Sequence, residues 1–234
     1  MFAFSPLTSI AHRHLRLAPQ KSFGFARDLN QVDLLLSEVW QFAACFPVVF
    51  VADTENGVAT IKPVAVLARP GQPNGLVSPD GTWAHPLLPY FLRIYPFGLQ
   101  PMKTGFRVMI DPSAHVLDQE YGIELFDASG GHSTELSKIV SLLRLLADTL
   151  RQTRLFTQTL DRLGVLRPIE VTNALPRQTR HYFSVDEGAL DQLSPNEIAL
   201  LRRRGWLHLA YAQAQSLERD LDNTHPLFWT RAQW

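Results

Sequence analysis

The sequence of 234 residues contains one cysteine, Cys45, and carries no formal net charge. A single thiol excludes an internal disulfide framework. Lysine plus arginine equals aspartate plus glutamate, at 22 each, so no overall basic field exists to attract nucleic acid or an anionic membrane. Cys45 adjoins an apolar run, where a buried and unreactive thiol is favoured over a nucleophile.

Long apolar runs are also absent. No window approaches the ~20 apolar residues that a membrane-spanning helix needs, and the first residues lack the basic start and apolar run of a secretory signal. We therefore expect a cytoplasmic protein without a transmembrane segment; a non-classical secretion route, which needs neither feature, stays open. With 46% hydrophobic and 19% charged residues the chain is of globular type, and we predict a single domain over residues 1–234.

Recognised catalytic, nucleotide-binding and metal-binding motifs are missing. The sequence has no HExxH, CxxC, GxSxG, GxGxxG or P-loop pattern. His12 and His14 would share one side of an extended segment, but no nearby carboxylate or thiol completes a metal site. Arg202 to Arg204 fall in the last turn of a predicted helix, which explains them without a nucleic-acid partner. We predict no catalytic residue, no metal and no cofactor; the alternative is an active site assembled from distant residues.

Short β-branched and aromatic runs predict a sheet-rich first half of the chain. Phe46 to Ala52 is an unbroken apolar run, typical of a strand buried on both faces. Asn56-Gly57 favours a chain reversal, after which Val58 to Ala68 predicts a second strand. Pro63 cannot donate a ladder hydrogen bond, so this strand should be bulged or at an edge there. Further strands are predicted at Phe106–Ile110, Ile123–Phe126, Pro168–Thr172, His181–Val185 and Trp206–Ala212.

Helical periodicity is strongest in the second half. Thr134 to Leu163 is the clearest helix, with an apolar stripe that includes Leu143 and Leu146, an N-cap at Ser133 and a C′ glycine at Gly164. Other helices are predicted at Val32–Phe42, Pro86–Ile94, Pro195–Arg204 and Gln213–Leu221. The first of these has a stripe that we expect in the core, consisting of Val32, Leu35, Leu36, Val39 and Trp40.

Together these elements predict an α+β fold. A mostly antiparallel, β-rich N-terminal half, about residues 1–130, should pack with a more helical C-terminal half, about residues 131–234, that contains one long helix. The apolar stripe of that helix must be covered. Packing within the chain is favoured, and a homo-oligomer formed through residues 134–163 is the alternative.

A dense group of aromatic residues follows the turn at Pro79-Asp80-Gly81. Aromatic rings beside an arginine can stack on sugars, peptides or planar cofactors, or anchor a protein interface. We predict a partner-binding or ligand-binding surface here; the alternative is that the same side chains fill a corner of the core. The group consists of Trp83, Tyr90, Arg93, Tyr95 and Phe97.

An ordered set of short segments covers nearly the whole sequence. The segments are Phe46–Val51, Asn74–Val77, Pro79–Trp83, Leu92–Phe97, Gly122–Phe126, Phe183–Glu187 and Leu209–Ala212. Their order along the chain is fairly specific, and the set resembles the bacterial SapC-like family.

The resemblance implies an accessory role. The family is named from surface-layer gene clusters, and its members also occur near genes for outer-membrane receptors and for oxygenases or halogenases. We therefore expect a non-catalytic protein that binds a protein or peptide partner in a surface-layer, outer-membrane uptake or peptide-modification pathway. The alternative is an enzyme that tailors a peptide or a glycan.

Overall fold

Each of two structural units is built from two separate stretches of chain. The computed structural model describes residues 2–55, 58–69, 71–102, 104–169 and 181–218. Unit 1 comprises Met1–Phe23 and Tyr90–Thr149, and unit 2 comprises Gly24–Pro89 and Leu150–Trp234. The predicted single domain concerns how the chain folds as a whole, and it stays a prediction.

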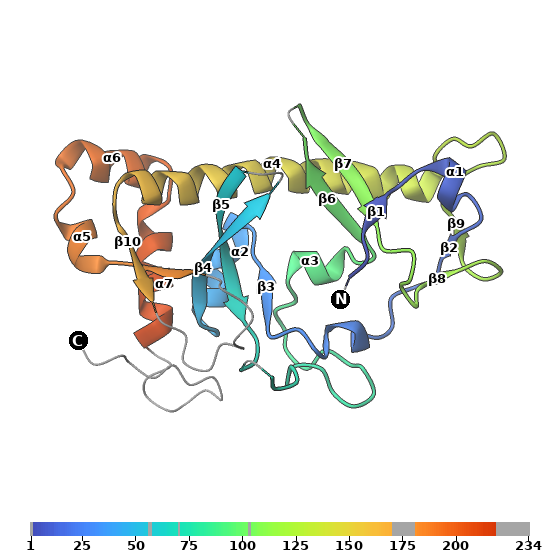
Figure 1. Ribbon diagram of the computed structural model, residues 1–234, viewed down its shortest axis with the longest axis horizontal. Helices are drawn as coiled ribbons and strands as arrows, with labels where there is room; N and C mark the ends of the chain where they lie inside the picture. Colours follow the sequence, from blue (N-terminus) through green and yellow to red (C-terminus); the bar gives the residue numbers. More distant parts are fainter. Residues whose placement is uncertain (1, 56–57, 70, 103, 170–180, 219–234) are drawn as a thin grey trace. The chain divides into compact units, whose positions relative to one another are not determined.

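Unit 2 contains a five-stranded antiparallel sheet with the order β10-β11-β4-β5-β3 (Figure 1). Residues 48–51 are at most 2% exposed, which confirms the prediction of a strand buried on both faces. The predicted reversal at Asn56-Gly57, and residues 170–172 of a predicted strand, lie outside the described residues. The strands are β3 (Gln31–Asp33), β4 (Val48–Glu55), β5 (Val58–Val66), β10 (Leu166–Ile169) and β11 (Tyr182–Val185).

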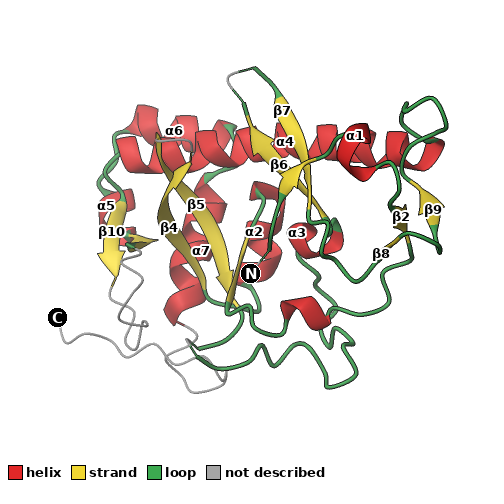
Figure 2. Cartoon of the chain, turned by 45° about the vertical axis from the view of Figure 1, so that its right-hand side comes forward, coloured by secondary structure: helices red, strands yellow, loops and turns green. Residues whose placement is uncertain are grey.

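Helices lie against one face of this sheet (Figures 1 and 2). Their apolar side chains form the main core cluster with the side chains of the sheet. Phe50 of β4 lies 6.1 Å from Phe156 of α4, whose ring lies 5.8 Å from Trp206 just before α7. A smaller cluster of four valines forms on the opposite face, with Tyr182 packed against it. The helices are α2 (Leu36–Ala43), α4 (Thr134–Arg162), α5 (Glu187–Asp191), α6 (Pro195–Arg203) and α7 (Leu207–Glu218).

A buried glutamine of α7 joins two strands where their own pairing stops. β4 and β11 pair only at two positions, the second being Phe50 opposite Phe183. Beyond them, Gln213 donates from Nε2 to the carbonyl of Val48 (2.7 Å) and accepts at Oε1 from the N–H of Val185 (2.8 Å). Gln213 is fully buried, and its one carboxamide satisfies a backbone group on each of the two strands.

Pro63 lies in a strand with two neighbours, and the predicted bulge there is wrong. β5 pairs with β4 in continuous register, and it lies between β4 and β3. Proline is tolerated because β3 ends at Asp33, opposite Val64. The Pro63 carbonyl still accepts from the N–H of Leu34 (2.9 Å), and the missing N–H faces the point where the chain leaves the sheet.

The helix predicted at Val32–Phe42 begins later than expected. Val32 pairs with β5 as part of β3, and α2 starts at Leu36. The pairing of Val32 in the sheet removes the first turn of the predicted stripe. Val39, Phe42 and Ala43 are the buried apolar side chains of α2, and Trp40 is 55% exposed. Assigning Trp40 to the core was therefore wrong.

The strand predicted at Trp206–Ala212 is a helix. α7 runs from Leu207 to Glu218, and residues 219–221 of the helix predicted next lie outside the described residues. Large and small side chains alternate here, which fits a strand, but burial follows the helical steps Leu209, Gln213 and Ser216. Tertiary burial therefore decided between two patterns that this short segment satisfies equally.

Unit 1 contains two small antiparallel sheets. The first has the order β1-β7-β6, from β1 (Ser5–Pro6), β6 (Phe97–Pro101) and β7 (Phe106–Ile110). The second has the order β8-β2-β9, from β2 (Arg16–Leu17), β8 (Leu117–Asp118) and β9 (Ile123–Glu124). Two short helices accompany them, α1 (Ser9–His12) and α3 (Tyr90–Arg93). The predicted strands at Phe106 and Ile123 are confirmed, and the predicted helix at Pro86–Ile94 is reduced to α3.

The long helix is the best-predicted element of the chain. α4 spans Thr134–Arg162, with the Ser133 hydroxyl accepting from the N–H of Leu136 (3.1 Å) and Gly164 at φ +68° just past its end. Leu143 and Leu146 are 0% and 7% exposed. With its antiparallel sheets and this helix, the described part of the chain confirms the predicted α+β fold.

Candidate functional site

The predicted aromatic surface is divided between the two units. Trp83 belongs to unit 2, whereas Tyr90, Arg93, Tyr95 and Phe97 belong to unit 1. Tyr95 and Phe97 are only 7% and 4% exposed, so their rings are part of the core of unit 1. The binding role of the five residues stays a prediction.

Tyr95 serves an internal contact. Its hydroxyl donates to the Asp111 carboxylate (3.2 Å), which also accepts from the N–H of Ala3 (3.2 Å) and from the hydroxyl of Ser113 (2.6 Å). The ring of Phe2 lies 5.1 Å from that of Tyr95. These contacts fasten the N-terminal segment to the end of β7, which gives Tyr95 a structural role.

The ionisation of this pair reflects its buried position. Burial raises the pKa of Tyr95 to about 12, and the Asp111 carboxylate adds to the rise. Burial alone would raise the pKa of Asp111, but hydrogen bonds from Ser113, Ala3 and Tyr95 outweigh it and lower that pKa below its usual value. The tyrosine is therefore neutral and the aspartate is charged throughout the physiological range.

Tyr90 and Arg93 remain as the accessible members in unit 1. The Arg93 guanidinium lies 4.8 Å from the centre of the Tyr90 ring, one turn apart on α3. Arg93 is exposed and Tyr90 is half-buried. A guanidinium held over a ring keeps its N–H donors in the plane of the group.

Trp83 is fixed within a long, ordered loop of unit 2. Its indole N–H donates to the carbonyl of Leu87 (2.9 Å), and the N–H of Leu87 donates to Nδ1 of His85 (3.1 Å). The His85 ring packs edge-on against Phe46 (4.8 Å). Trp83 is half-buried, so the indole helps to shape the loop and shows only part of its surface.

The earlier part of the same loop is held by Asn74 and Arg27. Asn74 is buried and donates to the carbonyl of Ala26 (3.2 Å), while the Arg27 guanidinium donates to the carbonyls of Ser78 and Pro79 (2.9 Å each). The predicted tight turn follows, closed by a bond from the N–H of Gly81 to the carbonyl of Ser78 (2.8 Å). These contacts give the family-like segments Asn74–Val77 and Pro79–Trp83 a structural role in holding the loop.

Charged side chains gather on the sheet of unit 2, around Lys62. Its ammonium group lies 2.9 Å from the Asp33 carboxylate and 3.0 Å from that of Asp53. Partial burial alone would lower the pKa of Lys62, but the two carboxylates outweigh it and raise the pKa to about 12. The cluster links β3, β4 and β5, and its one ammonium group and two carboxylates leave one negative charge in excess.

A group of acidic side chains lies around α5 in unit 2. Burial raises the pKa of Glu187, and the nearby Glu218 and Asp191 carboxylates add to the rise. The Tyr211 hydroxyl donates to Asp191 (2.7 Å). Among the described residues, the buried Glu187 Oε1 has no hydrogen-bond partner. A carboxyl with a raised pKa is the kind of group that acid–base catalysis uses.

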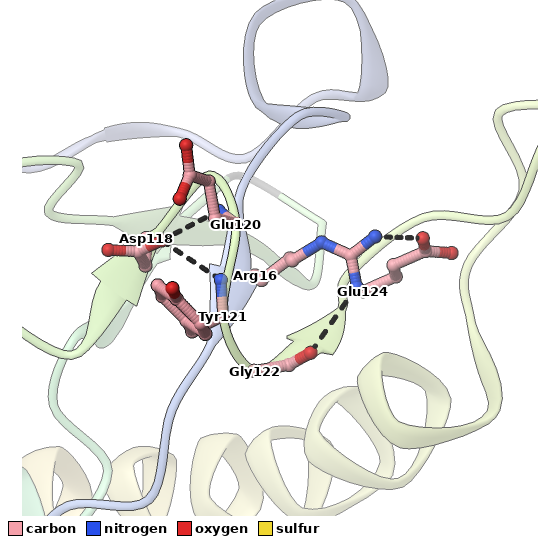
Figure 3. Close-up of polar contacts among 6 residues, drawn as sticks. All are labelled: Arg16, Asp118, Glu120, Tyr121, Gly122 and Glu124. Atoms are coloured by element: carbon pink, nitrogen blue, oxygen red, sulfur yellow. Dashed lines mark hydrogen bonds and ion pairs between the residues drawn. The ribbon is translucent and has the colours of Figure 1, made fainter.

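Sequence reasoning missed a corner of unit 1 that exposes two large side chains. Figure 3 shows one of them, Tyr121, with the polar contacts around it. Tyr121 and Ile123 are 73% and 53% exposed. The Asp118 carboxylate accepts from the N–H groups of Glu120 (2.6 Å) and Tyr121 (3.0 Å), which lower the pKa of Asp118. We define residues 118–124 as the tyrosine corner.

The tyrosine corner is fixed on its other side by β2. The Arg16 guanidinium donates to the Glu124 carboxylate (2.6 Å) and to the carbonyl of Gly122 (3.4 Å), as Figure 3 shows. Gly122 has φ +109°, and a Cβ there would lie 2.6 Å from the carbonyl oxygen of Leu17. Only glycine fits this close approach of two backbones, and the Gly122 of the family-like segment is the one signal that pointed here.

A second exposed aromatic residue, Trp40, lies on α2 in unit 2. Its ring is 55% exposed and packs edge-on against His208 of α7 (5.4 Å). The Arg204 guanidinium lies 5.4 Å from the centre of the Trp206 ring. No separate signal in the sequence pointed to Trp40, because its position on the predicted helix matched the apolar stripe.

The two histidines that the sequence placed side by side, His12 and His14, lie in unit 1. His12 is buried with its Nδ1 3.1 Å from the Thr8 carbonyl, whereas His14 is exposed, so the two imidazoles do not share one side.

On α4, Leu142 and Leu145 are 45% and 67% exposed. An interface of this helix would therefore use these two leucines rather than the buried stripe.

Metal and membrane features were sought among the described residues. Across those ranges, no three histidine, cysteine, aspartate or glutamate side chains gather closely enough to hold a metal ion. None of the described helices combines the length and the apolar character that crossing a membrane would take.

Three comparisons with known proteins complete the description. A protein-family model named SapC matches residues 7–220, which is nearly the whole chain. No curated protein matches the sequence, and no solved structure matches it.

Proposed function

Because the chain belongs to the SapC family, we propose that it is an accessory protein that acts by binding a protein or peptide partner. The pathways that the family resemblance suggests are surface-layer assembly, outer-membrane uptake and peptide modification. The observation that carries the proposal is the tyrosine corner, where Tyr121 and Ile123 are displayed on a turn that is fixed from both sides.

Such a turn is suited to recognition. Tyrosine offers a large apolar face and a hydroxyl at a low cost in conformational entropy, and it is enriched among residues that dominate interface energies. Asp118, Gly122 and Arg16 order the turn within the folded protein. A partner would then lose little free energy in ordering it on binding.

The direct test is complex formation with the products of neighbouring genes. Purified protein should co-elute with one of them on a sizing column, and Tyr121→Ala should weaken binding by about tenfold or more in calorimetry. Leu155→Ser, at a leucine of α4 that is 40% exposed in unit 2, is the control and should bind normally. Absence of a complex with every neighbouring product would count against the proposal.

An enzyme that tailors a peptide or glycan is the second candidate, favoured by the raised pKa and buried oxygen of Glu187. It predicts that candidate peptides or glycans change mass on incubation with the protein. The change should disappear in Glu187→Gln and persist in Tyr121→Ala. The two candidates therefore respond to different variants.

The cytoplasmic location expected from the sequence is part of the proposal. Cell fractionation of a host that expresses the protein at its natural level would test it. Recovery in the medium or on the cell surface would contradict it.

A further inference from the structure

The surface of unit 2 where α2 meets the start of α7 combines aromatic side chains with positively charged arginines. Trp40 is 55% exposed and lies against His208, and the His208 Cε1 atom lies 3.9 Å from where a Cβ of Gly205 would be. Arg204 precedes that glycine and stacks over Trp206. The side chains from Trp40 to Arg204 thus form one continuous patch, which we call the tryptophan patch.

The charge of this patch is positive. Arg202, Arg203 and Arg204 are all exposed. The acidic residue of α6, Glu197, is in its first turn and accepts from Ser194, at the opposite end from the arginines. On α7 the acidic residue is Glu218, the last residue of the helix, about ten positions from His208.

The third helix of the patch adds no opposing charge. On α2 the acidic residue is Glu38, which is buried and accepts from the N–H of Leu35 (2.9 Å). Arg202, Arg203 and Arg204 lie at the end of α6, four to six positions before the histidine that packs against the exposed indole, and the carboxylates Glu197 and Glu218 lie at the far ends of α6 and α7. A helix C-terminus favours cations, but that effect accounts for neither the exposed indole nor its histidine neighbour.

We infer that the tryptophan patch binds an acidic peptide segment of a partner protein, with an apolar side chain of the segment on Trp40 and its carboxylates on Arg202, Arg203 and Arg204. Guanidinium groups form paired hydrogen bonds with carboxylates, and a guanidinium stacked on a ring is already oriented for them. Tryptophan and arginine are enriched among the few residues that supply most of the binding energy of protein interfaces.

A protein segment fits this patch better than a nucleic acid does. Single-stranded nucleic acid is held by a basic groove with several stacking rings in succession. Here one exposed indole stands beside one run of arginines, in a chain whose formal net charge is zero. The inference rests on the proposed function because it assumes that the protein acts by binding. The tryptophan patch belongs to unit 2, whereas the tyrosine corner belongs to unit 1.

The test uses the full chain and a fluorescent synthetic peptide in which glutamate alternates with phenylalanine, followed by fluorescence anisotropy. Trp40→Ala should weaken binding about tenfold or more, and Arg202→Gln with Arg203→Gln should weaken it comparably and reduce its salt dependence. Matched controls in unit 1 are Tyr121→Ala, an exposed aromatic, and Arg13→Gln, an exposed arginine. Both should bind the peptide normally.

Three results would overturn the inference. They are equal binding of a peptide in which glutamine replaces glutamate, normal binding by folded Trp40→Ala, and tighter binding of an oligothymidylate that the same variants weaken. Far-UV circular dichroism establishes whether each variant is folded. The two arginine changes lie on exposed side chains, so the arginine variant still tests peptide binding if Trp40→Ala does not fold. Failure here with success of the Tyr121 experiment would remove this surface and leave the proposed function standing.

Discussion

A single carboxylate in unit 1, that of Asp111, gathers three segments of chain. It accepts from Ala3 near the N-terminus, from Tyr95 after α3 and from Ser113 in the following turn. Asp111 is 2% exposed, so these donors replace the water that the charge lost on folding. At the scale of one residue, an aromatic side chain that looked available for a ligand is committed to this contact.

Replacing Asp111 should show the value of that contact. Asp111→Asn replaces a carboxylate, which only accepts hydrogen bonds, by an amide whose NH2 group would face other donors. We therefore expect the free energy of unfolding to fall by about 2–4 kcal/mol. Tyr95→Phe removes one donor only and should cost about 1 kcal/mol. Urea denaturation followed by circular dichroism measures both; equal losses would contradict the central role of the carboxylate.

The same pair predicts the dependence of stability on pH. The pKa of Asp111 is lowered on folding, so its contribution is present above about pH 4 and is lost as the pH falls through the folded value. The pKa of Tyr95 is raised to about 12, so its contribution is present below about pH 10 and is lost between pH 10 and 12. Unfolding midpoints measured against pH should show a smaller alkaline decline in Tyr95→Phe than in the unmodified protein, and the remainder belongs to groups such as Lys62 whose pKa is also raised.

Gly122 supports a second prediction at this scale. Gly122→Ala combines a positive φ with a Cβ 2.6 Å from the Leu17 carbonyl oxygen, and it should cost about 2–3 kcal/mol in urea denaturation. Gly105→Ala is the matched control in the same unit, because it has φ +76° with nothing within 4 Å of the added carbon. It should cost about 1 kcal/mol. A similar loss in both variants would mean that the close approach to β2 is unimportant.

Among the elements, α4 was predictable because its evidence is local and repeated. Its cap, its stripe and its final glycine agree over 29 residues. Short elements lack such repetition. Val32 joined a sheet and Trp206–Ala212 formed a helix because partners far away in the sequence, β5 and the strands bound by Gln213, decided the outcome.

The candidate site was harder to predict for the same reason. The exposure of Tyr121 depends on Gly122 meeting Leu17, more than 100 positions away, and no local pattern records that approach. Trp40 occupies a helical step that fits a core stripe, and its exposure follows from where α2 begins. Composition and motifs therefore located the aromatic residues, and tertiary contacts determined which of them face outward.

The exposed leucines of α4 give a prediction for self-association, which stays open as the alternative partner. If two copies meet through this helix, sedimentation should show a dimer that Leu142→Glu with Leu145→Glu converts to a folded monomer. Leu143→Glu places a charge at a fully buried position and should instead unfold the protein, at a cost of about 3–5 kcal/mol. A wild-type monomer at every concentration would exclude this mode.

Over the whole molecule, the chain enters unit 2 at Gly24, leaves it after Pro89 and returns within α4 at Leu150. Unit 1 is complete once residue 149 has been made, but the sheet of unit 2 still lacks β10 and β11. The core residues Val39 and Phe50 also lack Phe156, Leu160 and Leu209 at that point. The folding of unit 2 therefore depends on the last third of the sequence.

A truncated chain tests this dependence. Residues 1–149 should contain an unfolded segment over 24–89 that binds a hydrophobic dye and promotes aggregation, because half of its core is missing. Dye fluorescence and the dispersion of amide NMR signals, compared with the full chain, measure the effect. Well-dispersed signals from β4 and β5 in the fragment would contradict it.

Gln213 gives unit 2 an internal reporter. The amide hydrogen of Val185 is bound to a helix side chain rather than to the neighbouring strand. Its exchange with deuterated solvent therefore records how often α7 lifts away from the sheet, whereas the backbone-paired amide of Val66, bound to Pro47, records opening of the strands themselves. The ratio of these two exchange rates would separate helix undocking from sheet opening in a single experiment.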